Sequence, residues 1–218
     1  MLRWLAGTPR SPGWPATLGP VRVKSGVVTL RPVRLRDGRD WSRLRIQNQN
    51  ELMPWEPTAQ GPWAARHHPS AWNQMYAILK SEAKLGAVLP FVIEVDGQYA
   101  GQLTIGNVQR GAVRSAWIGY WVDSTVTGGG VASAAVALGV DHAFGPVGLH
   151  RLEATVQPEN LASRAVLAKV GFRQEGLLKR YMDVNSRWRD HLLVAFTVEE
   201  LPGSAVEGLI RAGRAFAV

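Results

Sequence analysis

Three consecutive glycines, Gly128-Gly129-Gly130, stand between a β-rich run and a helical run of this 218-residue sequence. The run from Trp117 to Val122 predicts a strand, and the small and apolar residues from Val131 onward predict a helix. The first amides of a helix have no partner within it and lie at the positive end of its dipole. Glycines would let an anion such as a pyrophosphate approach these amides, so the segment indicates an anion cradle; an ordinary glycine turn is the alternative.

Two nucleotide-binding motifs use glycine-rich loops of this kind. A Walker loop requires a lysine and a hydroxyl residue after its last glycine, where this sequence has Val131 and Ala132. A dinucleotide-binding loop requires a further glycine, where Ser133 stands, and an acidic residue about 20 positions later, for which Glu153 is available. The Walker motif is therefore excluded, and the dinucleotide motif stays as a rival interpretation.

Composition excludes several kinds of chemistry. The absence of cysteine rules out disulfides, thiolate metal sites and an acyl group carried on an enzyme thiol. The five histidines lack the paired spacing of metal motifs, so we expect no metal. Apolar residues make up 46% of the chain, yet no apolar run approaches the roughly 20 residues of a membrane-spanning helix. We expect a soluble, cytoplasmic protein with no membrane partner.

The formal net charge of the chain is +8. Such a charge suits a polyanionic ligand, an acidic protein surface or a nucleic-acid-rich partner such as the ribosome. Lysines and arginines are spread along the chain, so a solvated basic surface without a specific partner is an equal alternative. Charge alone therefore identifies no partner.

The elements that must position the glycine loop alternate between β-rich and helical runs. Asp96-Gly97 predicts a tight hairpin, and Asn160 and Gly171 predict the start and the end of one helix. Seven strands are expected, over Val27 to Arg31, Val88 to Val95, Gly101 to Val108, Ser115 to Val122, His150 to Val156, Phe172 to Tyr181 and Leu192 to Val198. Helices are expected over Asp37 to Gln49, Ser70 to Leu85, Val131 to Phe144 and Asn160 to Val170, with a short one after Pro202.

The length of the chain favours one domain with a substantial core. Residues 1-25 contain several prolines and glycines and predict an irregular N-terminal arm. Residues 26-201 hold all the expected strands and form the main domain, and residues 202-218 form a C-terminal extension. Within the main domain, the proline-rich stretch from Met53 to Pro69 is long enough to indicate a functional loop.

Several motifs, taken in order, resemble a known family. They are Pro54-Trp55-Glu56-Pro57, Gly119-Tyr120-Trp121-Val122, Gly128-Gly129-Gly130, His150-Arg151-Leu152-Glu153-Ala154, Pro158-Glu159-Asn160-Leu161-Ala162-Ser163, Lys169-Val170-Gly171-Phe172, Glu175-Gly176 and Trp188-Arg189-Asp190-His191. Over about Val27 to Leu201, this ordered set resembles the RimJ-type ribosomal-protein-alanine N-acetyltransferases of the GNAT superfamily. Thr125 stands where that family usually has Gln or Arg at the start of its phosphate loop.

The resemblance implies a layered α+β GNAT fold with acetyl-CoA as cofactor. A mixed sheet of about seven strands would be splayed in the middle, between Trp117 to Val122 and His150 to Val156, and flanked by about four helices. The pantetheine arm would pair with Trp121 and Val122 in that opening, and the cofactor would also meet Asn160, Ser163 and Arg164. The pyrophosphate would bind the amides of Thr127, Gly128, Gly129, Gly130, Val131, Ala132 and Ser133.

Direct transfer of an acetyl group to an amine sets three chemical requirements. The attacking amine must be neutral, the oxyanion must be stabilised, and the leaving thiolate must receive a proton. Given the resemblance, we expect the backbone N–H of Val122 to stabilise the oxyanion and Ser163 to protonate the sulfur. A hydroxyl that only satisfies local helix backbone is the alternative for Ser163.

The general base is an open choice, for which we favour Glu56. Glu153, Asp190 and His191 are alternatives, directly or through water, because an α-amine with a pKa of about 8 needs little help. Glu56 would otherwise contact the substrate ammonium, and Asp190 and His191 would otherwise make structural hydrogen bonds. The acceptor pocket is expected to be walled by aromatic residues, unless they belong to the core: Trp55, Trp63, Tyr120 and Trp188.

We therefore expect an acetyl-CoA-dependent N-acetyltransferase acting by direct attack in a ternary complex. The expected acceptor is a protein or peptide N-terminus, with alanine or serine first, of a ribosomal or another protein. Acetylation of a small-molecule amine or antibiotic is one alternative, and a basic CoA- or RNA-binding, ribosome-associated protein without turnover is another. Direct nucleic-acid binding is not required, and the chain is expected to be a monomer or a homodimer.

Overall fold

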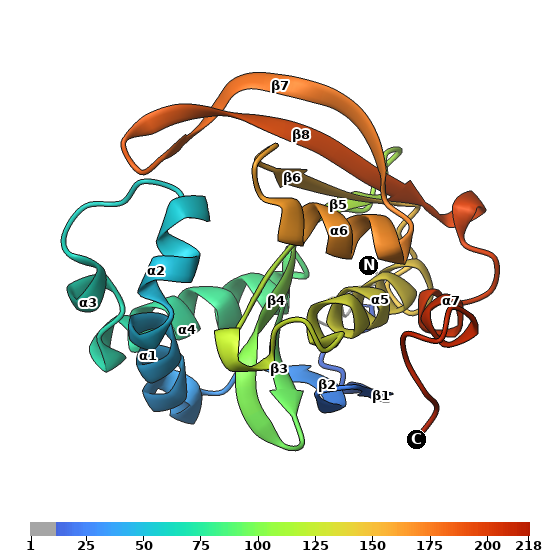
Figure 1. The fold of residues 1–218 in the computed structure, drawn as a ribbon, viewed down its shortest axis with the longest axis horizontal. Coiled ribbons are helices and arrows are strands. Elements are labelled where there is room, and N and C mark those ends of the chain that lie inside the picture. Colours follow the sequence, from blue (N-terminus) through green and yellow to red (C-terminus); the bar gives the residue numbers. More distant parts are fainter. Residues whose placement is uncertain (1–11) are drawn as a thin grey trace, which may run out of the picture.

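A mixed sheet of eight strands runs through the centre of the molecule, whose computed structural model describes residues 12–218 (Figure 1). The strand order is β1-β2-β3-β4-β5-β6-β8-β7. β5 and β6 run parallel, and the other neighbours are antiparallel. The strands are β1 (Leu18–Val23), β2 (Gly26–Pro32), β3 (Val88–Val95), β4 (Gln98–Gln109), β5 (Ser115–Val122), β6 (Arg151–Val156), β7 (Arg173–Val184) and β8 (Arg187–Thr197).

The hairpin of β3 and β4 forms because the chain reverses at Asp96-Gly97. Both residues have positive φ, +49° and +77°, as a two-residue type I′ turn requires. Side chains alternate along β3, so that Phe91 and Ile93 belong to one hydrophobic core and Val92 to another. The predicted turn is confirmed, and the sheet has a core on each face.

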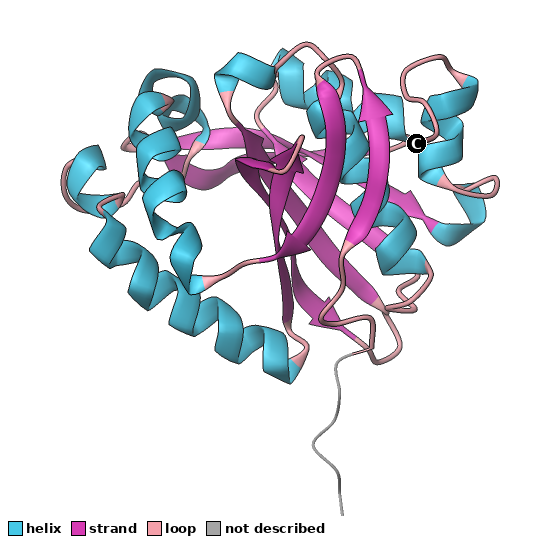
Figure 2. Cartoon of the chain, turned by 90° about the horizontal axis from the view of Figure 1, so that it is seen from below, coloured by secondary structure: helices cyan, strands magenta, loops and turns pink. Residues whose placement is uncertain are grey.

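Helices cover both faces of the sheet (Figure 2). On the face of Val92 lie α1 (Gly38–Gln47) and α4 (Pro69–Leu85), with the short α2 (Gln49–Leu52) and α3 (Trp63–Arg66) between them in sequence. On the other face lie α5 (Val131–Phe144), α6 (Leu161–Val170) and α7 (Ala205–Arg211). Of the 14 residues of α5, 12 are buried, so this helix is the centre of the larger core.

β5 and β6 pair only where both strands begin. Residues 115–117 are in register with residues 151–153, and no pairing between the two described strands follows. On its other side, β6 pairs with β8 along its whole length. The sheet is therefore splayed between β5 and β6, as the family resemblance implied.

The main difference from the sequence expectation is one additional strand. β1 lies within residues 1-25, which we expected to be irregular, while residues 1–11 of that arm lie outside the described part. The strand is hard to recognise because Gly19 and Pro20 interrupt it, only Val21 and Val23 are buried, and its pairing with β2 contains a bulge. Two further helices, α2 and α3, were not expected, because they have only four residues each and show no periodicity.

The C-terminal residues pack on the same core as the rest of the chain. Leu209 of α7 and Ala215 are buried in the core that contains α5. Phe216 pairs with Arg22 of β1 through two backbone hydrogen bonds, of 2.8 and 3.1 Å. The short helix expected after Pro202 is confirmed, and the domain boundaries at residues 26 and 201 stay a prediction.

Candidate active site

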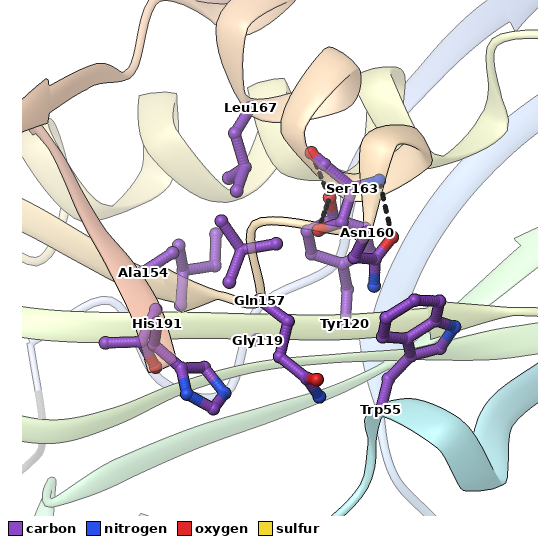
Figure 3. A pocket seen from close by; sticks show the side chains of 12 residues that line it. Trp55, Gly119, Tyr120, Ala154, Gln157, Asn160, Ser163, Leu167 and His191 are labelled. Atoms are coloured by element: carbon purple, nitrogen blue, oxygen red, sulfur yellow. Dashed lines mark hydrogen bonds between the residues drawn. The ribbon is translucent and has the colours of Figure 1, made fainter. Parts of the chain in front are cut away.

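A cavity of about 150 Å³ occupies the opening between β5 and β6 (Figure 3). Backbone groups at the edges of a splayed sheet have no strand partner and are available to a ligand. The lining residues come from the loop after α2, from β5, from β6 and the turn that follows it, and from α6 and β8. They are Trp55, Ile118, Gly119, Tyr120, Ala154, Thr155, Val156, Gln157, Asn160, Ser163, Leu167 and His191.

The start of α6 holds a pair of hydroxyl groups at this cavity. Asn160 caps the helix, because its Oδ1 accepts a hydrogen bond from the backbone N–H of Ser163 at 3.0 Å. Ser163 is thereby fixed in the first turn, with its Oγ 3.0 Å from the hydroxyl of Tyr120. The Tyr120 hydroxyl also lies 3.3 Å from the Ser163 carbonyl oxygen, to which it can donate. The structure brings these three predicted residues together and gives the capping role to Asn160.

Burial raises the pKa of Tyr120 to about 12, against the opposite effect of its hydrogen bond with Ser163. The phenol therefore stays protonated at neutral pH and can donate a proton or a hydrogen bond. We predicted Tyr120 as a wall of the acceptor pocket and did not foresee its contact with Ser163. Strand alternation gave a signal, because Ala116 and Ile118 are buried and place Tyr120 on the same face.

The backbone of Val122 faces the opening. The N–H of Asp123 donates to the carbonyl of Ala100 in β4 at 2.8 Å, and successive amides of a strand point to opposite edges. The Val122 N–H therefore points away from β4, toward the opening. By the same alternation the Trp121 amide points toward β4, and its indole donates to Gln102 at 3.1 Å. Of the two residues predicted to pair with pantetheine, Val122 is the one whose amide faces the opening.

The glycine loop forms the start of α5. Gly128 and Gly130 have φ of +75° and +95°, which glycine adopts without the strain of a side chain. Gly130 is the N-cap residue and has no side chain that could accept hydrogen bonds from the first turn. The amides without an acceptor inside the helix are therefore those of Val131, Ala132 and Ser133.

Two contacts of this loop were not visible in the sequence. Ser25, in the turn between β1 and β2, donates its N–H to the Gly129 carbonyl at 3.3 Å, and its side chain fills the space that a Cβ at Gly129 would need. The Thr127 amide donates to the Ser124 carbonyl at 3.3 Å. Among the amides predicted for the pyrophosphate, that of Thr127 already has an acceptor.

Asn48 connects the junction of α1 and α2 to the loop before α5. It is completely buried, its Nδ2 donates to Asp123 Oδ1, and its Oδ1 accepts from the Ser124 N–H, both at 2.8 Å. Thr125, which replaces the family's Gln or Arg, donates its hydroxyl to the other Asp123 oxygen at 2.5 Å. The sequence gave no sign of this role, because the partners of Asn48 lie 75 and 76 residues away.

Glu56, the base favoured from the sequence, forms an ion pair with Arg45 of α1. The side chain of Arg45 is 12% exposed and lies over the ring of Trp121 at 4.9 Å. Burial lowers the pKa of Arg45, while the Glu56 carboxylate opposes that effect. Glu56 lines a second cavity, of about 260 Å³, and does not line the cavity that contains Ser163.

The three alternative bases lie in different surroundings. Asp190 accepts a hydrogen bond from the backbone N–H of Arg180 at 2.7 Å, which is a structural contact of the β7–β8 hairpin. Glu153 forms an ion pair with the neighbouring Arg151. His191 is buried and lines the cavity with Ser163. Of the four candidates, His191 is the one that shares this cavity.

The proline-rich loop 53–62 packs against the tip of the β7–β8 hairpin. The Thr58 N–H donates to the Asp183 carbonyl, and the Thr58 hydroxyl to the Asp183 carboxylate, both at 2.8 Å. The Ser186 N–H donates to the Thr58 hydroxyl at 2.7 Å. Segments more than 120 residues apart are thus joined beside the cavity.

The four aromatic residues expected around the acceptor take different positions. Trp55 lies at the cavity of Ser163, with Gln157 donating to the neighbouring Pro54 carbonyl at 3.3 Å. Tyr120 lines the same cavity, and Trp63 lines the second one. Trp188 is 65% exposed and lines neither.

Within residues 12–218, no group of three or more His, Cys, Asp or Glu side chains is arranged to hold a metal ion. No helix in that range is both long and apolar enough to cross a membrane.

A sheet that splays between two parallel strands, with a helix start on a glycine loop beside the opening, is the architecture of an acyl-CoA-binding transferase. The chain belongs to the acetyltransferase (GNAT) domain family, whose model matches residues 28–173. The expected GNAT fold and N-acetyltransferase class are thereby confirmed.

Two of the following three relatives are similar over most of the chain, and the third over about half of it. RimJ of Mycobacterium smegmatis, solved in complex with CoA-disulfide, is 61% identical, with a TM-score of 0.94 over 95% of this chain and 99% of that one. The ribosomal protein uS5-alanine N-acetyltransferase of Escherichia coli is 26% identical over 86% of this chain and 96% of its own length. The probable N-acetyltransferase YjcK of Bacillus subtilis is 41% identical over 46% of this chain, a match that spans 55% of its own length.

Proposed function

We propose that this chain transfers the acetyl group of acetyl-CoA to the α-amine of a protein N-terminus that begins with alanine or serine. The observation that carries the proposal is the opening between β5 and β6, which the Val122 amide faces and whose cavity is lined by the paired Tyr120 and Ser163. Similarity to M. smegmatis RimJ and to the E. coli enzyme supports an acceptor among ribosomal proteins. A cytoplasmic location and a monomeric or dimeric state belong to the same proposal.

The cofactor would lie along the edge of β5 and across the start of α5. Its pyrophosphate would accept hydrogen bonds from the amides of the first turn of α5, helped by the helix dipole. Its pantetheine arm would pair with the backbone of Val122. Asn160 and Arg164 would line the other side, where Arg164 is exposed and donates to the Pro158 carbonyl at 2.8 Å.

The reaction forms one C–N bond and breaks one C–S bond. The neutral amine attacks the thioester carbonyl, and the Val122 N–H stabilises the negative charge on the carbonyl oxygen. The C–S bond then breaks, and Ser163 gives its hydroxyl proton to the departing thiolate. Tyr120, whose pKa of about 12 keeps it protonated, replaces that proton across the 3.0 Å contact. The proton that the attacking nitrogen loses on becoming an amide returns to Tyr120 through solvent, so that the proton count closes.

His191 fits the remaining role, removal of a proton from the ammonium group of the acceptor. Its Nδ1 lies 3.2 Å from the Arg189 carbonyl, a contact in which Nδ1 acts as the donor, so that Nε2 is the ring nitrogen available as an acceptor. Glu56, held by Arg45, would instead contact the substrate ammonium. His191→Asn should lower the single-turnover rate, and Glu56→Gln should raise the KM for the acceptor; the reverse result would return the base role to Glu56.

A panel of acceptors tests the proposal against its alternatives. Thiol release from acetyl-CoA should be fastest with peptides that begin with alanine or serine, and slow with N-terminally blocked peptides, polyamines and aminoglycosides. Faster release with a small amine would replace the protein acceptor by a small molecule. CoA binding in calorimetry without thiol release from any acceptor would favour a binding protein without turnover.

A further inference from the structure

The second cavity lies on the other side of the loop that carries Trp55. Trp55 lines the first cavity, and the next residue, Glu56, lines the second. Neighbouring Cα atoms are about 3.8 Å apart, so the two cavities are separated by one short piece of chain at these two residues. The second is lined by Gln49, Met53, Glu56, Pro57, Thr58, Ala59, Gly61, Pro62, Trp63, Arg66, Asn185 and Ser186.

Two guanidinium groups, of Arg45 and Arg66, and two carboxylates, of Glu56 and Asp183, lie in or beside this cavity; the Asp183 carboxylate accepts a hydrogen bond from the Thr58 hydroxyl. Arg66 lines it and lies over the ring of Trp63 at 5.2 Å, and Arg45 lies over the same ring at 5.5 Å. Glu56 is the one carboxylate among the lining residues, and Arg45 pairs with it. Within residues 12–218, Arg66 forms no ion pair. One guanidinium group, that of Arg66, is therefore left without an ion pair.

The Nε atom of Arg66 is also buried without a hydrogen-bond acceptor, as is the Nε of Arg45. A buried donor without a partner is unfavourable, and a ligand oxygen is one of the partners that explain such a group. His67, beside Arg66, does not change the local charge. Burial, followed by the charges of Arg45 and Arg66, lowers the pKa of His67 to about 4, so the ring is neutral at pH 7.

We propose that the second cavity binds an aspartate or glutamate side chain of the acceptor protein, within the first few residues after the acetylated amine. This inference rests on the function proposed above. The guanidinium group of Arg66 presents donors in a fork that fits a carboxylate. An extended chain advances about 3.3 Å per residue, so positions two to five of an acceptor whose amine lies in the first cavity reach the second.

Paired peptides test the proposal. Each peptide begins with alanine and carries one glutamate at position two, three, four or five, and its partner carries glutamine there. At one position, kcat/KM should be about tenfold higher for glutamate, as a charge-assisted pair predicts, and added salt should reduce the ratio. Equal values within every pair would overturn the proposal.

Variants of Arg66 show whether that residue causes the preference. Arg66→Met should remove the advantage of glutamate, and Arg66→Glu should favour lysine at the same position. Arg43→Met is the matched control, because Arg43 is an exposed arginine of α1 paired with Asp40, and its loss changes the net charge equally. A preference that survives Arg66→Met, or that Arg43→Met removes equally, would contradict the proposal. Arg66→Gln, with a melting curve, serves if Arg66→Met does not fold, and should remove the advantage of glutamate in the same way.

The glutamine peptides separate this inference from the proposed function. Their acetylation tests α-amine transfer alone, because they lack the carboxylate. If no peptide is acetylated, the proposed function fails, and calorimetry of each peptide pair with the CoA-saturated protein still decides whether the second cavity takes a carboxylate. Tighter binding of the glutamate peptide to the unaltered chain, and not to Arg66→Met, is then the expected result.

Discussion

The two sides of the opening differ in how far apart in the sequence their contacts lie. On the cofactor side, residues 122–133 and 160–164, the glycine loop is contiguous, and the Asn160 side chain caps α6 by accepting from an amide three residues away. On the acceptor side, residues 53–66 and 181–191, Thr58 reaches Asp183 across 125 positions. Local motifs form the ligand-facing groups of the first side, to which Asn48 and Ser25 add supporting contacts from distant segments. The second side exists only once the whole chain has folded.

This difference has a consequence for mutational effects. The cofactor side begins on α5, which is almost wholly buried, whereas the contacts of Thr58 on the acceptor side are exposed. Exposed hydrogen bonds contribute less to stability than buried ones. We therefore expect changes on the cofactor side to act on acetyl-CoA or on chemistry, and changes on the acceptor side to act on the peptide.

The largest effect is expected from Gly130→Val. Valine is strained at a φ of +95°, its Cβ would lie 3.2 Å from the side chain of Val23, and it would obstruct the amides of α5. Acetyl-CoA binding should weaken by more than about a hundredfold in calorimetry. Gly148→Val is the control, because Gly148 has a φ of +73° with open space around it, beyond the other end of α5. Gly148→Val should lower the melting temperature and leave acetyl-CoA binding intact. An equal loss of binding in both variants would contradict a role of the glycine loop in holding acetyl-CoA.

Ser163→Ala should lower kcat by about 10²-fold or less, with little change in the KM for acetyl-CoA. General acid catalysis supplies about 10² to 10⁴, and water can replace part of it. Because Asn160 is the cap, the variant should keep its thermal stability. Tyr120→Phe should give a smaller loss. Where product release is slow, single-turnover rates must be measured instead of kcat. A normal single-turnover rate in Ser163→Ala would contradict the general-acid role of Ser163 and make solvent the source of the proton.

Acidification should destabilise the protein through His67. On the acceptor side, the ring of this buried histidine packs against Trp63, and its Nδ1 contacts the Trp63 carbonyl. Its pKa falls from 6.5 in the unfolded chain to about 4 in the folded one. The contribution to stability is therefore complete above pH 6.5 and is lost as the pH falls toward 4. Between pH 7 and pH 5 the free energy of unfolding should drop by about 2 kcal/mol from this group. Urea unfolding should show a smaller drop for His67→Gln, and an identical drop would contradict the assignment.

The smallest effect is expected from Thr58→Val, which removes the hydroxyl shared by Asp183 and Ser186. The KM for the peptide should rise by about threefold to tenfold, as the loss of exposed hydrogen bonds allows. Thr127→Val is the matched control, since its exposed hydroxyl bonds to Ser124 on the cofactor side. If Thr58→Val changes the KM for acetyl-CoA instead, the division between the two sides does not hold.

The same division explains what the sequence could predict. The glycine loop, the Asn160 cap and the Asp96-Gly97 turn depend on residues within a few positions of one another, and the structure has all three. The splayed sheet followed from the resemblance and not from any local pattern. The sequence did not predict β1, because its two buried valines are too few to show the alternation of a strand.

The acceptor side was harder to predict because its contacts join distant segments. Nothing near Glu56 in the sequence marks Arg45 as its partner, since the ion pair depends on how the chain bends through α2. Trp188 was placed in the pocket by its motif, yet its side chain is exposed and lines neither cavity. The pairing of Tyr120 with Ser163 needs the packing of α6 against β5, which no spacing reveals.

One measurement tests the central claim, that this chain acetylates an α-amine at the opening between β5 and β6. A peptide that begins with alanine and contains an internal lysine is mixed with the protein and isotopically labelled acetyl-CoA for a single turnover. Tandem mass spectrometry then locates the label. We predict label on the α-amine alone, and much less of it with Ser163→Ala. Label on the lysine, or undiminished labelling by the alanine variant, would contradict the account.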